Sequence, residues 1–331
     1  MAFKTRITEL FGIRHPIVMG GMAGVGRAEL AAAVSNAGGL GIITALTPGS
    51  PELLDAEIKK VKSLTDKPFG VNMTIFPTIN SPPYELYRDV IIANDVKIVE
   101  TAAGVSPKEY WAAFKAAGVK VIHKCTAVRH ALSAERAGVD VISIDGFECA
   151  GHPGEDDIPG LILIPAAANQ LKIPMIASGG IGDGRGLVAA MALGADGVNM
   201  ATRFCATVEA PLHQNFKEAM VRNDERSTNL VFRTMHNTAR VAKNSISDEV
   251  VRLEREGAKF RDIRHLVAGE RGREALASGD VEGGMWWASM SQVHIQDIPT
   301  VQVLIDRIIG NAIDIVRNRL DKALVDDKVG A

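Results

Sequence analysis

The feature that most constrains this chain is an alternation of short apolar runs with helix-like segments, continued through residue 200. The apolar runs predict strands at 17–19, 40–43, 69–73, 97–100, 120–123, 140–144, 174–177 and 197–200. Helices are predicted between them, for example over 27–36, 51–64, 107–117 and 127–137. Strands this apolar are not suited to face water on either side, so the pattern favours an α/β fold with a closed parallel sheet, a (β/α)8 TIM barrel.

Three junctions between a predicted helix and the next strand are alike, and they support a repeating β/α unit. They are Ala117-Gly118-Val119, Ala137-Gly138-Val139 and Leu193-Gly194-Ala195. Glycine after an alanine-rich helix and before a buried strand is typical of the loop that returns the chain to a parallel sheet. An open, doubly wound sheet is the alternative, but no strand–GxGxxG–helix unit occurs near the N-terminus.

The pattern changes after Thr202. Residues 208–297 carry nearly equal numbers of basic and acidic side chains and no strand-like run, which predicts a helical lobe with a solvated surface. Regular helix returns over about 299–320. Its predicted buried face consists of Val301, Leu304, Ile305, Ile308, Ala312 and Ile315. We therefore expect a barrel of residues 1–207 and 298–325, with a small helical insertion lobe of residues 208–297 between strand 8 and helix 8.

Composition narrows the class of protein. Of the 331 residues 47% are hydrophobic, which is enough for a large core. The formal net charge of −2 produces no positive electrostatic field that would attract nucleic acid or an anionic membrane. The uncharged stretch 30–51 is interrupted by glycine and proline, so it is not a membrane span. The three cysteines form no CxxC pair, and the first residues lack a signal-peptide core. We expect a cytoplasmic protein with no metal site, no nucleic-acid partner and no membrane contact.

Two glycine- or hydroxyl-containing loops predict a phosphate site. In a (β/α)8 barrel the active site lies where the strands end, and the loops after strands 7 and 8 commonly bind phosphate through backbone N–H groups. Here Ser178-Gly179-Gly180 follows the seventh predicted strand, and Ala201-Thr202 follows the eighth. Glycines alone could simply form a tight turn, but the two loops together favour the phosphate interpretation.

Two further positions at the same end of the barrel suit a flat, electron-accepting ring. The glycine-rich run 20–24 would let such a ring lie against the main chain, with a flexible turn as the alternative. Lys124 follows the predicted strand 120–123, where a cation could stabilise the negative charge of a reduced flavin. The alternative for Lys124 is a side chain that extends to solvent along the barrel rim.

The most polar loop, residues 145–157, follows the sixth predicted strand and contains His152. An imidazole at a barrel mouth is suited to proton transfer near neutral pH, which makes His152 the candidate catalytic residue. Three alternatives stay open. Cys149 and His152 could form a thiol–imidazole pair, His152 and the acidic run 155–157 could bind a metal, or His152 could be an ordinary loop residue.

Taken together, these motifs resemble the nitronate monooxygenase family, formerly called 2-nitropropane dioxygenases, over nearly the whole chain. The resemblance is carried by Gly20-Gly21-Met22, Asn72-Met73-Thr74, His123-Lys124-Cys125-Thr126, the run 146–160, Ser178-Gly179-Gly180 and the run 199–204. Ala150-Gly151-His152 is diagnostic of this family among FMN barrels. The longer run 146–160 is similar to the subgroup that includes bacterial NADH:quinone reductases.

The resemblance implies non-covalent FMN in the barrel mouth, with NAD(P)H as a possible co-substrate. It implies that the ring is bordered by Gly21, Met22, Ala23, Thr74, Lys124, Ala150 and Gly151. It implies that the phosphate is held by Ser178, Gly179, Gly180, Ala201 and Thr202. His152 matches the active-site histidine of the family. Residues 23 and 24 are small here, where some family members carry larger side chains, which would widen the substrate cavity.

The implied activity is oxidation of alkyl nitronates with O2 to a carbonyl compound and nitrite. The alternative is an NAD(P)H:quinone reductase that uses the same FMN site, with nicotinamide entry gated by the proline-containing loop 77–83. More distant alternatives are an enoyl-thioester reductase, a nucleotide barrel similar to IMP dehydrogenase and a non-catalytic flavin carrier. The expected partner is a small molecule, and the tryptophans at 286–287 could cap the core or support a homodimer.

Overall fold

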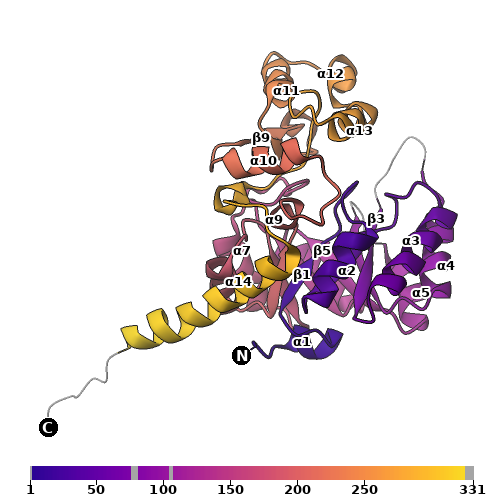
Figure 1. The fold of residues 1–331 in the computed structure, drawn as a ribbon. Helices are drawn as coiled ribbons and strands as arrows, with labels where there is room; N and C mark the ends of the chain where they lie inside the picture. Colours follow the sequence, from indigo (N-terminus) through magenta and orange to yellow (C-terminus); the bar gives the residue numbers. More distant parts are fainter. Residues whose placement is uncertain (1, 76–80, 104–106, 325–331) are drawn as a thin grey trace, which may run out of the picture.

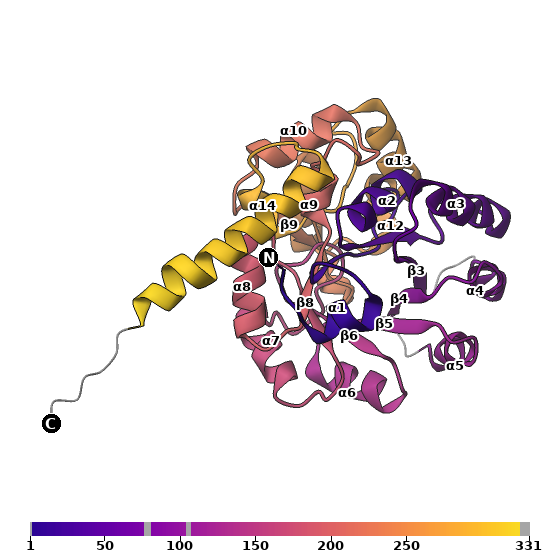
Figure 2. The ribbon, with the colours of Figure 1, turned by 60° about the horizontal axis from the view of Figure 1, so that its bottom comes forward.

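The computed structural model describes residues 2–75, 81–103 and 107–324, and it confirms the closed parallel barrel (Figures 1 and 2). The strands are β1 (Ile17–Met19), β2 (Leu40–Thr44), β3 (Phe69–Ile75), β4 (Ile98–Ala103), β5 (Lys120–Cys125), β6 (Val141–Asp145), β7 (Met175–Ser178) and β8 (Gly197–Met200). They pair in chain order, and β1 closes the barrel on β8, with Ile17 opposite Val198.

A ring of helices surrounds the strands, as Figure 2 shows. They are α2 (Ala28–Asn36), α3 (Pro51–Leu64), α4 (Tyr84–Ala93), α5 (Lys108–Ala116), α6 (Val128–Arg136), α7 (Gly160–Ala168), α8 (Gly184–Ala192) and α14 (Val301–Asp314). Local sequence explains their ends: α3 begins where the Ser50 side chain accepts a hydrogen bond from the Leu53 N–H and proline occupies the first turn. α14 packs against both α8 and α2 and completes the ring, which confirms the predicted eighth helix.

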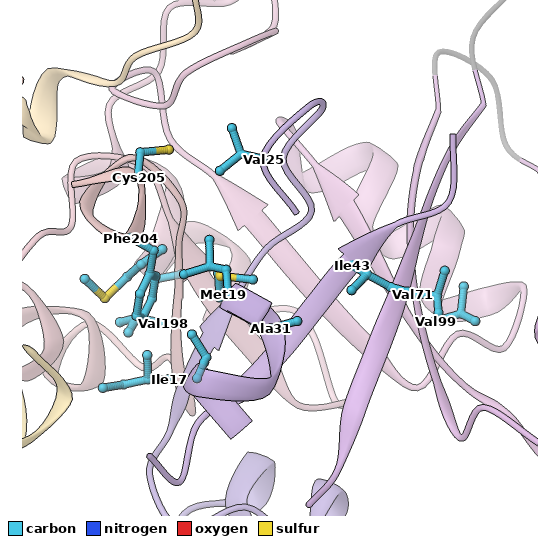
Figure 3. Packing of buried hydrophobic residues seen from close by; sticks show 14 of the residues in the cluster. Ile17, Met19, Val25, Ala31, Ile43, Val71, Val99, Val198, Phe204 and Cys205 are labelled. Atoms are coloured by element: carbon cyan, nitrogen blue, oxygen red, sulfur yellow. The ribbon is translucent and has the colours of Figure 1, made fainter. Parts of the chain in front are cut away.

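One end of the barrel is closed by apolar side chains. α1 (Arg6–Phe11), a short helix that we did not predict, places Ile7 and Phe11 against Leu40 and Ile98 near the N-terminal ends of the strands. Elsewhere the core lies between strands and helices, and Figure 3 shows its apolar side chains around β1 and β8. The C-terminal ends of the parallel strands lie together at the opposite end of the barrel.

The segment between β8 and α14 is not purely helical. It contains α9 (Thr202–Cys205), α10 (Gln214–Arg222), β9 (Thr228–Val231), β10 (Ala239–Ala242), α11 (Ser245–Arg255), α12 (Phe260–Val267) and α13 (Gly269–Ser278). β9 and β10 form an antiparallel pair that the helical prediction missed. Each strand has only four residues, which is too short for an alternation of apolar and polar side chains to be recognised. In Figure 1 the segment lies over one end of the barrel. The domain boundaries at 207/208 and 297/298 stay a prediction.

Within residues 2–75, 81–103 and 107–324, no helix is long and apolar enough to cross a membrane. The uncharged stretch 30–51 is divided between α2, β2 and the start of α3. All three cysteines are buried and unpaired with one another.

Candidate active site

The predicted site residues all lie at the C-terminal end of the barrel, on strand ends or in the loops that follow them. They are Gly21, Met22, Ala23, Thr74, Lys124, Ala150, Gly151, His152, Ser178, Gly179, Gly180, Ala201 and Thr202. Part of the loop that was expected to gate a nicotinamide, residues 76–80, lies outside the described residues. The role of each residue stays a prediction, but their gathering at one end follows from the barrel.

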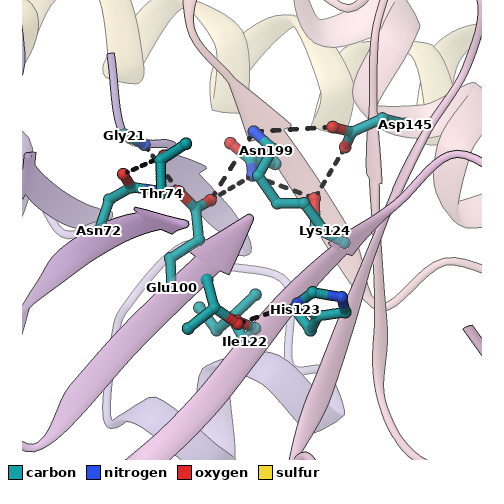
Figure 4. A network of polar contacts seen from close by, with 11 residues as sticks. Gly21, Asn72, Thr74, Glu100, Ile122, His123, Lys124, Asp145 and Asn199 are labelled. Atoms are coloured by element: carbon teal, nitrogen blue, oxygen red, sulfur yellow. Dashed lines mark hydrogen bonds and ion pairs between the residues drawn. The ribbon is translucent and has the colours of Figure 1, made fainter. Parts of the chain in front are cut away.

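A buried carboxylate that we did not predict organises this end of the barrel (Figure 4). Glu100, at the middle of β4, is fully buried. Its Oε2 accepts hydrogen bonds from the Gly21 N–H at 2.9 Å and from Asn72 Nδ2 at 2.6 Å, and its Oε1 accepts from Asn199 Nδ2 at 2.9 Å. Thr74 adds a contact, because its hydroxyl donates to Asn72 Oδ1 at 3.0 Å. Glu100 therefore joins the loop after β1 to β3 and β8.

Lys124 lies between two buried carboxylates. Its Nζ is 3.9 Å from Glu100 Oε1 and 3.7 Å from Asp145 Oδ2, so its charge is not a free cation at the rim. Burial acts to lower the pKa of Lys124, but Asp145 and Glu100 outweigh it and the pKa is raised. Burial raises the pKa of Asp145, although Lys124 opposes that effect. Lys124 also lies within β5, whereas we predicted the strand to end one residue earlier.

Neutral side chains fix the second carboxylate. Ser143 Oγ donates to Asp145 Oδ1 at 3.1 Å and accepts a hydrogen bond from Asn199 Nδ2, also at 3.1 Å. Asn199 thus links the two carboxylates, because it donates to Glu100 directly and to Asp145 through Ser143. The same network requires glycine after β1, since a Cβ on Gly21 would lie 2.3 Å from Asn72 Cβ. Close packing, and not only a flexible turn, accounts for that glycine.

The loops after β7 and β8 have the backbone geometry of an anion site. Gly179 and Gly180 have φ values of +92° and +74°, which an L side chain rarely adopts. In the part of the chain that the structure describes, the N–H groups of Gly179, Gly180 and Thr202 donate no hydrogen bond. Because β7 and β8 are neighbours, these unpaired donors belong to adjacent loops. Backbone N–H groups without partners are the donor set that a phosphate requires, so the residues present fit the phosphate of FMN.

His152 is held at the mouth by a strand of the inserted segment. The Gly151 N–H donates to the Arg240 carbonyl at 3.1 Å, and the Arg240 N–H donates to the Gly151 carbonyl at 2.6 Å, so β10 pairs with the residue before His152. The imidazole lies 6.0 Å from the Trp287 ring, centroid to centroid. The residue is exposed overall, but the protein around its ring lowers the pKa of His152 by desolvation, while Glu155 opposes this. The imidazole is therefore neutral at pH 7 and can accept or donate a hydrogen bond.

The acidic run after His152 has structural partners. Glu155 accepts from the Thr238 N–H at 2.7 Å, Asp156 pairs with Arg129 at 2.9 Å, and Asp157 pairs with Arg233 at 2.6 Å. Among the described residues no group of three or more His, Cys, Asp or Glu side chains is placed to hold a metal ion. These contacts do not support the metal interpretation of the loop.

The thiol–imidazole alternative also finds little support. Burial raises the pKa of the Cys149 thiol, and the nearby Asp145 raises it further, so the thiolate is disfavoured. A nucleophilic cysteine needs the opposite environment.

This chain is similar to known proteins over most of its length. A family model described as nitronate monooxygenase matches residues 4–311. A "(3aS,4S,5R,7aS)-5-hydroxy-7a-methyl-1-oxo-octahydro-1H-indene-4-carboxyl-CoA dehydrogenase" of Rhodococcus jostii is 36% identical over 87% of this chain and 76% of the relative. A probable nitronate monooxygenase of Staphylococcus saprophyticus is 30% identical, over 96% of this chain and 99% of the relative. The solved structure of FabK from Thermotoga maritima has a TM-score of 0.89 and 36% identity, covering 97% of this chain and 100% of that one.

Proposed function

The chain belongs to the nitronate monooxygenase family, and on that basis we propose that it is an FMN-dependent oxidoreductase whose small substrate binds beside His152. The observation that carries the proposal is the set of unpaired backbone donors after β7 and β8, at the same end of the barrel as a neutral imidazole. When bound, FMN would supply the electron transfer.

Each group of residues has a separate task in this proposal. The N–H groups of Gly179, Gly180 and Thr202 hold the phosphate, beside Ser178 and Ala201. The ring is bordered by Gly21, Met22, Ala23, Thr74, Lys124, Ala150 and Gly151. Thr202 is itself held in place, because its hydroxyl accepts a hydrogen bond from the Ser289 N–H at 3.1 Å. Gly21, which borders the ring, is fixed by its hydrogen bond to Glu100, so this part of the cradle is held in place before the cofactor binds.

Oxidation of an alkyl nitronate is the first candidate reaction. Two nitronate ions and one O2 would give two carbonyl compounds and two nitrite ions. The neutral imidazole of His152 can donate a hydrogen bond to a nitronate oxygen, or accept the proton from the α-carbon of a neutral nitroalkane. Similarity to the probable nitronate monooxygenase of S. saprophyticus, over nearly the full length of both chains, supports this candidate.

An NAD(P)H:quinone reductase is the second candidate, and one contact favours it. The Trp287 indole is 43% exposed and lies beside the His152 ring, which provides an aromatic surface at the mouth. Flat conjugated rings such as nicotinamide and quinone stack on such a surface. In that reaction NAD(P)H and a proton would reduce the quinone to a hydroquinone.

Thioester chemistry is a third, more distant candidate. The R. jostii relative is named for a carboxyl-CoA compound, and its similarity keeps an enoyl-thioester reductase in consideration. The family match favours all three flavin reactions over a nucleotide barrel similar to IMP dehydrogenase.

Replacement of His152 tests the role of the imidazole. We expect His152→Ala to keep FMN and to lose about 10²- to 10⁴-fold in turnover, the usual contribution of a positioned acid or base. In the wild type, kcat/KM for a neutral nitroalkane should fall as the pH drops through a value below the ordinary 6.5 of histidine, because the pKa of His152 is lowered and only the neutral ring accepts a proton. The variant should lack that step.

The matched control is His130→Ala, because His130 is an exposed histidine on α6. It should leave FMN content, turnover and the pH profile unchanged. Turnover of His152→Ala equal to that of His130→Ala would remove His152 from the mechanism.

A further inference from the structure

We infer that Glu100 and Asp145 are positioning residues that act through Lys124: they offset its charge and so limit how strongly the site favours a reduced, negatively charged cofactor. This inference rests on the proposed FMN site. It reverses the simplest interpretation of Lys124, in which a lone cation at the barrel rim would stabilise that charge without opposition.

The carboxylates are placed to do this because they flank the lysine at nearly equal distances. Lys124 Nζ lies 3.7 Å from Asp145 and 3.9 Å from Glu100, on opposite neighbouring strands. Its side chain is 20% exposed, whereas those of Asp145 and Glu100 are 9% and 0% exposed. Lys124 opposes the effect of burial on Asp145 and so favours the charged form of that carboxyl group. Water screens the charges of this cluster weakly, so each of them acts on any charge added at the barrel mouth.

The carboxylates are also held by neutral donors, so they cannot turn away from the lysine. Glu100 receives hydrogen bonds from Gly21, Asn72 and Asn199, and Asp145 receives one from Ser143. None of these four donors carries a charge that would neutralise a carboxylate. The Gly21 contact links the same carboxylate to the glycine run that we assign to the ring. Glu100 thus influences both the position of that run and the electrostatics around it.

A redox titration separates this role from a merely structural one. We would measure the ratio of reduced to oxidised FMN at one fixed potential, against a reference dye, in the FMN-bound protein and its variants. Lys124→Met should lower the ratio about tenfold, and Asp145→Asn should raise it about tenfold, because they remove charges of opposite sign. For a two-electron couple this corresponds to about 30 mV in each direction. The double variant should return to within about threefold of the wild type.

Glu100→Gln should also raise the ratio. However, three N–H groups donate to the two carboxylate oxygens of Glu100, and glutamine has only one oxygen to accept them, so this variant can impair folding. Asp145→Asn is therefore the deciding variant. Asp140→Asn is the control, because Asp140 precedes the same strand and pairs with Lys120 at the opposite end of the barrel. It should not change the ratio.

The outcomes distinguish this inference from the proposed function. Shifts of equal sign in Lys124→Met and Asp145→Asn, or an Asp145→Asn ratio equal to that of Asp140→Asn, would overturn the inference alone. A wild type that binds no FMN would overturn the proposed function and this inference with it.

Discussion

His123 shows how a single buried side chain makes the stability of this barrel depend on pH. It is 6% exposed in β5, next to Lys124, but its ring lies apart from the Lys124 network (Figure 4). Its Nδ1 lies 2.9 Å from Thr101 Oγ1, and its ring packs edge-on against Trp111 with centroids 4.7 Å apart. Burial lowers the pKa of His123 to about 4, although the contact with Thr101 opposes that effect.

The lowered pKa of His123 makes the folded protein less stable as the pH falls. Between an ordinary pKa of about 6.5 and the folded value of about 4, the unfolded chain binds the proton that the folded chain excludes. The contribution of His123 is therefore complete above pH 6.5 or so and is lost as the pH falls toward 4, by up to about 3 kcal/mol. We expect the free energy of unfolding in urea to decrease more steeply with falling pH in the wild type than in His123→Leu. The exposed-site variant His265→Leu, on α12, should keep the wild-type slope. Equal slopes in all three proteins would show that His123 is not the source.

For single residues of the candidate site, the sequence predicts some positions well and others not at all. Glycines and His152 could be located because they follow predicted strands, and the end of a strand is where a parallel barrel places its chemistry. Glu100 and Asn199 could not, because a single polar residue in an apolar run has no meaning until its partners are known. Those partners are 28 and 99 residues away along the chain, Asn72 and Asn199 for Glu100. The one available signal was a charged residue within a buried strand, Glu100 itself, which is seldom tolerated unless it is paired.

Among the elements, β10 has the clearest task, because it fixes the loop that carries His152. Besides the backbone pairing with Gly151, the buried Arg240 side chain donates to the Phe147 carbonyl at 3.0 Å and lies 4.6 Å from the Phe147 ring centroid. It also donates to Thr228 Oγ1 at 2.9 Å. The inserted segment therefore contacts this loop at Phe147 and at Gly151, on both sides of Cys149.

Arg240→Met tests whether that contact matters for catalysis. The variant keeps an apolar stem but loses the guanidinium hydrogen bonds and the contact with the ring, so we expect about 1–3 kcal/mol less stability. We also expect a lower kcat with unchanged FMN affinity, because His152 becomes less well positioned. Arg240→Lys should restore little, since a lysine cannot reproduce the guanidinium fork.

Arg252→Met on α11 is the matched control, because Arg252 makes exposed ion pairs with Glu249 and Glu256, which contribute little. Denaturant unfolding and steady-state kinetics would be measured on all the variants. If Arg240→Met behaves like Arg252→Met, the inserted segment does not position the loop.

Periodicity explains why most elements could be predicted and a few could not. α3 was predicted over 51–64, as observed, because proline marks its start and one apolar face runs along it. The pair β9 and β10 was missed because its strands owe their stability to packing, with Val231 and Val241 in a small apolar cluster under α11 and α12. α1 was missed for a similar reason, since a six-residue helix shows too little periodicity. Its burial against the strand ends is a tertiary effect.

For the whole molecule, the two ends of the barrel have different roles. The N-terminal end is closed by apolar side chains from α1 and the strands, whereas the C-terminal end carries the charged network, the unpaired N–H groups and His152. The inserted segment lies over the latter end (Figure 1) and contributes Trp287 beside His152. Proteins similar to this chain carry different names, so membership of the family does not by itself fix the substrate.

A visible absorption spectrum tests FMN-dependent redox chemistry in this chain most directly. The purified chain, reconstituted with FMN, would be mixed without oxygen with an alkyl nitronate and, separately, with NADH, while the visible flavin band is followed. We predict a bound flavin band that bleaches with at least one of the two reductants: bleaching by the nitronate favours nitronate oxidation, and bleaching by NADH with recovery on a quinone favours quinone reduction. A chain that shows no bound flavin band after reconstitution, or a bound flavin that neither reductant bleaches, would contradict the proposal that this protein is an FMN-dependent oxidoreductase.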